Sequence, residues 1–347
     1  MAVYTTIDDP GLYFNTKLYT GTGSSLANTG VGFQPDWVWI KGRSGATEHV
    51  LTDSVRGVTK ELSSDDTGAE ETVAQGLTAF GSDGFTVGTD GSYNTSSATY
   101  TSWNWKAGTT SGIVTNASTD ITPSAYSFNQ TAGFNVFKFT GAGNSGDTVA
   151  HGLGAIPEFI IIKVTGTTHG WITYHGALGG TKNLNLETSN GAATAISRWN
   201  NTNPDSVNIT LGNSNNVNGA STEYICYAFS GKQGYSKFGE YTGNGNAAGP
   251  FVYTGFKPAF LMCKRTDDAS EWSMFDNKRN TFNVVNHHVY ADLPNAEGDD
   301  DDLDFTANGF KFRRDAGNTN GSGATYIYAA FAEAPFVNSN GVPCNAR

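Results

Sequence analysis

Three sequence elements recur in the same order along the chain, so one kind of structural unit must account for three stretches of about 100 residues each. Each copy opens with an aromatic residue followed by Thr-Gly-X-Gly, continues with a mostly apolar run from proline to lysine, and closes with Asn six positions before Tyr. The openings begin at Tyr19, Phe139 and Tyr241, the proline-led runs span 35–41, 157–163 and 258–264, and the closing pairs are Asn94/Tyr100, Asn218/Tyr224 and Asn320/Tyr326. Five positions after each closing Tyr comes another aromatic residue, Trp105, Phe229 or Phe331.

The composition favours many short strands joined by tight turns. The chain holds 43 glycines and is only 15% charged, which suits β-structure better than helices or disorder. We therefore predict an all-β fold of three repeated antiparallel β-sandwich, jelly-roll-like units. The proline-led runs are apolar on both faces, which predicts central strands covered on both sides. The one helix-like patch is at residues 68–75, for which the sequence leaves open a surface turn or a short helix.

The repeat also predicts the division of the chain. We expect an N-terminal arm that serves for attachment (1–18), unit 1 (19–107), a Thr/Ser/Gly-rich linker (108–127), unit 2 (128–231), unit 3 (232–336) and a polar tail (337–347). The sequence leaves open whether the units stand in a row or form a pseudo-threefold cluster. The short joint between units 2 and 3 suggests a rigid pair with a more independent unit 1.

The charge and the cysteines exclude several classes of partner. With a net charge of −11 the surface does not neutralise phosphates, so we expect no nucleic acid and no membrane as partners. No stretch approaches the ~20 apolar residues of a membrane span, and the start lacks the pattern of a secretory signal. Cys226 and Cys263 lie in apolar runs and Cys344 in the tail, which predicts two buried thiols and one tail thiol, compatible with assembly in the cytoplasm.

Two motifs resemble catalytic or phosphate-binding elements but favour structural roles. The Thr-Gly-X-Gly element is followed by a strand instead of the helix that a phosphate loop needs, so we interpret it as a tight turn with glycine at positive φ. Asp53 and Arg56 recur as Asp276 and Arg279, whereas unit 2 has His175 and Leu178 at these places. The pattern predicts an Asx-type turn braced by a salt bridge, with a contact between units or subunits as the alternative.

The acidic and histidine-rich segments give no catalytic or metal pattern. His287 and His288 with the acidic residues 299–302 and Asp304 are candidate cation ligands, but the EF-hand spacing is absent and a solvated loop is favoured. The neighbouring carboxylates at 65–66 and 70–71 do not supply two groups facing each other across a cleft, as glycosidases require. We therefore predict no catalytic, cofactor-binding or metal-binding residues, and no enzymatic activity.

Trp37 and Trp39 share one face of a predicted strand, and Trp103 and Trp105 share one face of another. Packing in the core of a sandwich is the favoured interpretation. Subunit contacts and stacking on a glycan are the alternatives that this pattern leaves open.

Several segments together resemble a family of structural proteins from marine tailed phages, of the kind that infect cyanobacteria and pelagic bacteria. The segments are residues 4–10, 35–43, 53–57, 103–108, 234–239 and 326–336, so the resemblance spans nearly the whole chain. Members of that family are mostly described as tail-fibre-like or as structural proteins. The resemblance implies a virion component without an active site.

Two positions on the virion follow from this resemblance. The first is a tail or fibre component that contacts the host surface, with other virion proteins and a surface glycan as partners. The second is a capsid decoration (cement) protein that stabilises the head. A homo-oligomer is expected in either case, and a trimer would suit both.

Overall fold

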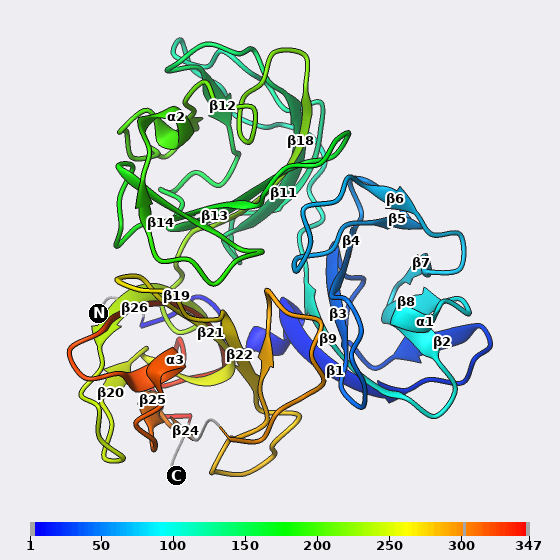
Figure 1. The fold of residues 1–347 in the computed structure, drawn as a ribbon, viewed down its shortest axis with the longest axis vertical. Helices are drawn as coiled ribbons and strands as arrows, with labels where there is room; N and C mark the ends of the chain where they lie inside the picture. The colour runs from blue at the N-terminus through cyan, green and yellow to red at the C-terminus, as the bar shows by residue number, and fades with distance from the viewer. Residues whose placement is uncertain (1–3, 301–302, 345–347) are drawn as a thin grey trace.

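A computed structural model describes residues 4–300 and 303–344 of the chain. Three β-sandwich units surround a common centre, with unit 1 in blue to cyan, unit 2 in green and unit 3 in yellow to red (Figure 1). In each unit the principal sheet has the same strand order, in which the closing strand lies between the opening strand and the proline-led strand. The all-β prediction is confirmed, and the units form a pseudo-threefold cluster instead of a row.

Unit 1 combines a four-stranded sheet, β1-β9-β3-β4, with a three-stranded sheet, β2-β8-β7, and a short β5-β6 ladder. Its elements are η1 (Pro10–Leu12), β1 (Phe14–Thr20), β2 (Leu26–Thr29), β3 (Trp37–Gly42), β4 (Val50–Asp53), β5 (Lys60–Glu61), β6 (Glu71–Thr72), β7 (Leu77–Gly81), β8 (Gly84–Val87), α1 (Gly91–Asn94) and β9 (Thr99–Trp105).

Unit 2 combines a seven-stranded sheet, β10-β11-β18-β13-β14-β15-β16, with the β12-β17 pair. Its elements are β10 (Ala125–Asn129), β11 (Phe134–Thr140), β12 (Thr148–Ala150), β13 (Phe159–Val164), β14 (Ile172–His175), β15 (Lys182–Asn185), β16 (Ala193–Thr194), α2 (Ile196–Trp199), β17 (Asn208–Thr210) and β18 (Glu223–Phe229).

Unit 3 combines a five-stranded sheet, β19-β26-β21-β22-β23, with a three-stranded sheet, β20-β25-β24. Its elements are β19 (Ser236–Thr242), β20 (Phe251–Tyr253), β21 (Phe256–Arg265), β22 (Ser273–Asp276), β23 (Val289–Tyr290), β24 (Leu303–Thr306), β25 (Gly309–Phe312), α3 (Gly317–Asn320) and β26 (Thr325–Pro335). No helix among the described residues is long and apolar enough to cross a membrane.

The proline-led strands are apolar on both faces because each belongs to two cores. In β3, Val38 and Ile40 point into the sandwich core of unit 1, while Trp37 and Trp39 point into a core that all three units share. Successive side chains of a strand alternate between its faces, so β13 and β21 divide their side chains in the same way. The predicted covering of these strands on both sides is confirmed.

The aromatic residues five positions after the closing tyrosines meet at the centre of the molecule. The ring centroids of Trp105 and Phe331 and of Phe229 and Phe331 are 5.6 Å apart, and those of Trp105 and Phe229 are 6.3 Å apart. Trp37 stacks on Trp105 at 4.5 Å and on Tyr227 of unit 2 at 4.3 Å. The tryptophans are thus core residues as predicted, and the shared core is the interface between the units.

Each closing Asn–Tyr pair fastens the Thr-Gly-X-Gly turn of its own unit. The Tyr326 hydroxyl donates to the Gly317 carbonyl (2.6 Å) and accepts from the Gly321 amide (2.7 Å), and the ring of Tyr326 stacks on Tyr241 at 4.9 Å. The Asn320 side chain accepts from the amide of Asn244. The pairs in units 1 and 2 make the corresponding contacts.

The glycines of that turn are required by its geometry. A Cβ on the first glycine would lie 2.2–2.4 Å from a main-chain oxygen in every unit, and the second glycine has φ between +61° and +89°. The predicted tight turn is therefore what these residues form. They are Gly21 and Gly23, Gly141 and Gly143, and Gly243 and Gly245.

Some predicted boundaries differ from the structure. The 68–75 patch is not helical: it contains β6 and a turn. β1 begins at Phe14, inside the predicted 1–18 arm, and β10 begins at Ala125, inside the predicted 108–127 linker. In unit 1 the repeat motif starts after β1 has begun. In unit 2, β10 is an edge strand that the principal sheets of units 1 and 3 do not have.

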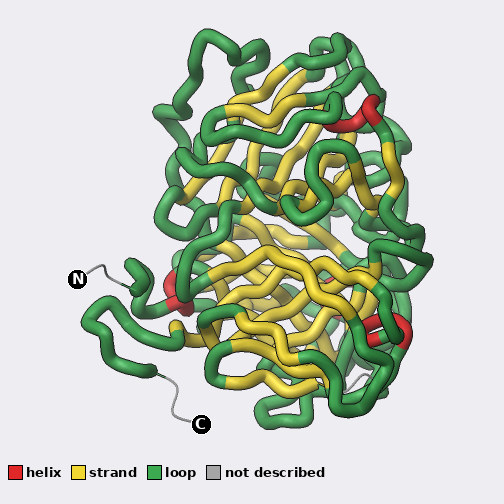
Figure 2. Tube along the Cα trace, turned by 90° about the vertical axis from the view of Figure 1, so that its left-hand side faces the viewer, coloured by secondary structure: helices red, strands yellow, loops and turns green. Residues whose placement is uncertain are grey.

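The segment before β1 is packed against unit 3. Thr5 donates to the Gln233 carbonyl (2.7 Å), and Tyr4 donates to the Gly255 carbonyl (2.8 Å). Asp8 accepts from Ser339 of the predicted tail, and both ends of the described chain lie on the same side of the molecule (Figure 2). Unit 1 is thus bound to unit 3 as well as to unit 2, and the expected independence of unit 1 is wrong.

We predict that Tyr326→Phe lowers the free energy of unfolding by about 1–3 kcal/mol, because the Gly317 carbonyl and the Gly321 amide lose their partner while the ring stacking remains. Tyr100→Phe and Tyr224→Phe should cost similar amounts, since their hydroxyls make the same pair of bonds. Chemical denaturation of the three variants measures this, and a loss in only one of them would contradict equivalence of the units.

Candidate functional site

The lysine that ends each proline-led run is buried and joins two units. Lys41 Nζ donates to the Gly42 carbonyl (3.0 Å) and to the carbonyl of Pro294 in unit 3 (3.1 Å). Lys163 reaches Thr67 of unit 1 (3.2 Å) and Lys264 reaches Ser189 of unit 2 (3.1 Å). Each unit therefore holds the preceding one, and the three contacts close a ring.

Burial lowers the pKa of each of these lysines to about 8. Taking an ammonium group out of water is costly unless acceptors replace the water, and two carbonyl groups do so here. The repeated lysine is therefore a connector of units, a role that its position at the end of an apolar run does not reveal.

A ring nitrogen adds a second bond at every junction. His49 Nε2 lies 2.8 Å from the Tyr290 carbonyl, Trp171 donates to the Ser63 carbonyl (2.8 Å), and Trp272 donates to the Asn185 carbonyl (3.0 Å). His49 is neutral, since burial and then the charge of Lys41 hold its pKa well below the ordinary value. Its Nδ1 accepts from Trp39, which leaves Nε2 as the donor. The histidine thus substitutes for the tryptophan of the other units.

A carboxyl group accepts the main-chain N–H of each of these three ring residues. The pairs are His49 with Asp65 (3.0 Å), Trp171 with Glu187 (2.8 Å) and Trp272 with Asp292 (3.0 Å). Burial raises the pKa of Asp65 to about 6. Burial, followed by a hydrogen bond and charge repulsion from Glu271, raises the pKa of Asp292 to about 8.

The Asp–Arg pairs are Asx turns and inter-unit contacts at once. Asp276 Oδ1 accepts from the amides of Lys278 and Arg279, and its Oδ2 accepts from Arg279 Nε (2.6 Å) and from the indole of Trp103 in unit 1 (3.1 Å). In unit 1, Asp53 accepts from Arg56 and from Tyr227 of unit 2. Both interpretations of this pattern are confirmed.

Unit 2 reaches the same arrangement with His175. Its Nδ1 accepts from the Ala177 amide (3.2 Å), as an Asx turn would, and its Nε2 lies 3.1 Å from the carbonyl of Tyr328 in unit 3. Burial lowers the pKa of His175 to about 4 and keeps the ring neutral. The position equivalent to Trp103 and Tyr227 is Ala329, which has no side-chain donor, so a histidine that donates to the backbone fits this junction.

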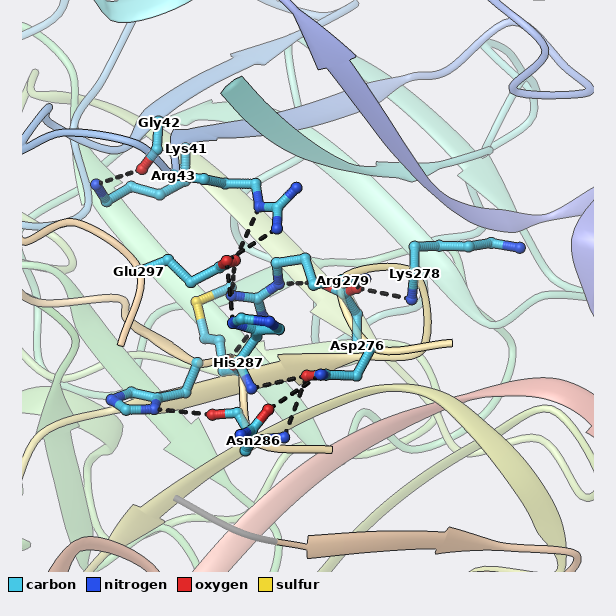
Figure 3. A network of polar contacts seen from close by, with 12 residues as sticks. Lys41, Gly42, Arg43, Asp276, Lys278, Arg279, Asn286, His287 and Glu297 are labelled. Carbon is cyan, nitrogen blue, oxygen red and sulfur yellow. Dashed lines mark hydrogen bonds and ion pairs between the residues drawn. The ribbon is translucent and has the colours of Figure 1, made fainter. Parts of the chain in front are cut away.

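The junction between units 3 and 1 carries an additional ionic network (Figure 3). Arg43 and Glu297 form a bidentate pair at 2.8 and 2.9 Å. Glu297 also contacts Arg279 at 3.4 Å and His287 at 3.2 Å. His287, one of the two histidines considered as candidate cation ligands, is therefore part of the ring closure.

The other suggested metal and acid residues do not form a site. His288 faces Asp300 at 3.6 Å, residues 301–302 lie outside the described residues, and Asp304 pairs with Arg313. Residues 4–300 and 303–344 contain no cluster of His, Cys, Asp and Glu suited to a metal ion. Glu70 pairs with Arg56 and Lys60. The cysteines lie as predicted, two buried and Cys344 exposed.

Three hollows lie at equivalent places around the ring, where the proline-led strands begin and the closing strands end. Their volumes are about 550, 350 and 430 Å³. The first is lined by units 1 and 2, the second by units 2 and 3 together with Tyr4, and the third by unit 3. Asp36 and Lys106 line the first, Glu158 and Lys232 the second, and Lys257, Asn277, Lys278 and Glu333 the third. Pockets of this size suit a small ligand or a single sugar residue. These hollows, which differ in lining, are the candidate functional site.

The fold and its junctions define a closed pseudo-threefold ring of β-sandwiches with variable hollows at one end. The chain belongs to the family described as Domain of unknown function (DUF7483), whose model matches residues 9–335 and so covers all three units. No curated protein and no solved structure matches the chain.

We predict that Asp276→Ala lowers the free energy of unfolding by about 3–5 kcal/mol, because the fully buried Arg279 loses its nearer counter-ion and keeps only Glu297, at 3.4 Å. Asp267→Ala is the matched control. Its pair with Arg265 is exposed and should contribute less than about 1 kcal/mol. Urea unfolding of both variants is the measurement, and equal losses would contradict the assigned role of Asp276.

We predict that Asp292→Asn makes stability less dependent on pH. A carboxyl whose pKa is raised to about 8 in the folded state contributes stability that is complete below its ordinary pKa and is lost as the pH rises to about 8. An amide does not titrate and still accepts from Trp272. Relative to wild type, the variant should gain stability between pH 5 and pH 8.5 in denaturant titrations. Asp267→Asn should show no such gain, because the pKa of the Asp267 carboxyl is lowered and not raised in the folded protein.

Proposed function

We propose that this protein is a non-enzymatic structural component of a tailed-phage virion, carried on the tail or a fibre and facing the host surface. The observation that carries the proposal is the closed ring, in which the repeated lysines, ring nitrogens and carboxylates all hold units together. Such a ring is a rigid scaffold that presents loops and hollows. The resemblance to phage structural proteins supports the same role.

We propose no catalytic activity because the side chains that could react are engaged in contacts between units. Asp53 and Asp276 form buried ion pairs, and the pKa of His175 is lowered by burial, as is common in active sites. Each of the three residues, however, makes its hydrogen bonds inside a junction between units. None of these three residues lines one of the hollows.

The tail position is favoured by the differences among the three hollows. A protein that recognises a host needs a variable surface on a constant scaffold. Here the scaffold residues repeat, while the hollow linings change from unit to unit. A surface glycan of the host is the partner that fits this interpretation, together with neighbouring virion proteins and further copies of the chain.

A head decoration protein is the second candidate, and the pseudo-threefold ring favours it. One chain already presents three similar faces around an axis, so a single copy fits a threefold position of a capsid without first forming a trimer. In that case the hollows would contact capsid proteins instead of the host.

Quantitative mass spectrometry of purified virions tests the proposal and separates the two positions. We expect the chain in the particle at a copy number far below that of the major capsid protein. A copy number close to that of the capsid protein would move it to the head. Absence from particles that package normally would contradict both positions.

A further inference from the structure

Unit 3 has a loop that the other units lack. The segment between β22 and β23 covers residues 277–288, twelve positions, whereas the corresponding segments 54–59 and 176–181 have six each. The extension folds beside the hollow of unit 3 and supplies part of its lining. This doubled loop thus lies at the candidate site.

The extended loop is fixed in place by its asparagines. Asn280 Oδ1 accepts from the amides of Asn286 (3.1 Å) and His287 (2.7 Å), which closes the loop on itself. The Asn283 side chain makes two bonds to the backbone of Phe305 in β24, at 2.9 and 3.0 Å. Two residues lie between Asn280 and Asn283, and the second is therefore held in a defined position.

That residue is Phe282, and its side chain is 72% exposed, more than any other large hydrophobic side chain described. An aromatic ring left in water forfeits the stabilisation that its burial would give. Because the loop is anchored on both sides, the ring is displayed at the rim of the hollow. Such a displayed ring is typical of a surface that contacts a ligand.

Most other residues that line the hollow are polar, and Lys278 is the one charged residue among them in addition to an ion pair. Lys257 and Glu333 form an ion pair at 2.7 Å, and Asn277 donates to the same carboxylate at 3.0 Å. Burial alone would raise the pKa of Glu333, but these two bonds outweigh it and lower the pKa. The carboxylate is therefore charged and already paired, and Thr281 and Thr306 add hydroxyl groups to the lining.

We propose that the hollow of unit 3 binds one neutral sugar ring of a surface polysaccharide. A sugar ring has an apolar C–H face, which suits the ring of Phe282, and a rim of hydroxyls, which suits amides, hydroxyls and a paired carboxylate. The volume of about 430 Å³ accommodates one such ring. Since Lys257 already neutralises Glu333, a charged substituent on the sugar is not required. The inference deepens the proposed function in its host-facing form and rests on it.

Titration of the full-length protein with sugars tests the proposal. The probes are neutral oligosaccharides of glucose, galactose, mannose and N-acetylglucosamine, and oligosaccharides of uronic acids are the charged comparison set. Binding is measured by saturation-transfer NMR at millimolar sugar concentrations. We expect binding of at least one neutral sugar and a weakening of about tenfold or more in Phe282→Ala.

Phe251→Ala is the matched control, because Phe251 is 49% exposed on β20 of the same unit but does not line the hollow. It should bind as wild type does, and thermal unfolding should show both variants folded. Binding of uronic acids alone, equal binding by Phe282→Ala, or no binding at millimolar concentrations would each overturn the proposal. These outcomes are independent of the virion copy number, so the two hypotheses can fail separately.

Discussion

Burial of both faces of the principal sheets is the constraint on which the rest of the structure depends. A sandwich covers only one face of its sheet, and the second face of each sheet carries large aromatic residues such as Trp37, Phe159 and Phe260. Three such faces turned toward one another bury all of them in one shared core. Trp105, Phe229 and Phe331, at the centre of that core, make every unit dependent on the other two.

The polar junctions follow from the same arrangement. Where the shared core ends, the next inward-facing position of each proline-led strand is a lysine, and it is fully buried in all three units. An ammonium group at that place is stable only if carbonyl oxygens meet it, and the preceding unit supplies one. The apolar core holds the units together, while the lysine and the neighbouring ring nitrogen specify their register.

Much of the scaffold is predictable from the sequence, because its signals are local. Glycines at fixed positions, prolines at strand starts and the Asn–Tyr spacing identified the turns, the two-faced strands and the repeated unit. The ring was not predictable, since the acceptors for Lys41, Lys163 and Lys264 are main-chain carbonyls in segments without a shared pattern. The hollows were not predictable from the sequence for a similar reason, since the residues that line them come from strand ends that differ among the units.

Fusion of three units in one chain gives a freedom that a trimer of identical chains lacks. In a homotrimer any loop change appears three times, whereas here the twelve-residue loop with Phe282 occurs once. The replacement of Asp by His175 and of Trp by His49 shows that even junctions have diverged, provided that the hydrogen bond between units is kept. Because the constraint acts on junctions and cores, hollows at the strand ends are free to change. Specific recognition is therefore expected in one unit at a time.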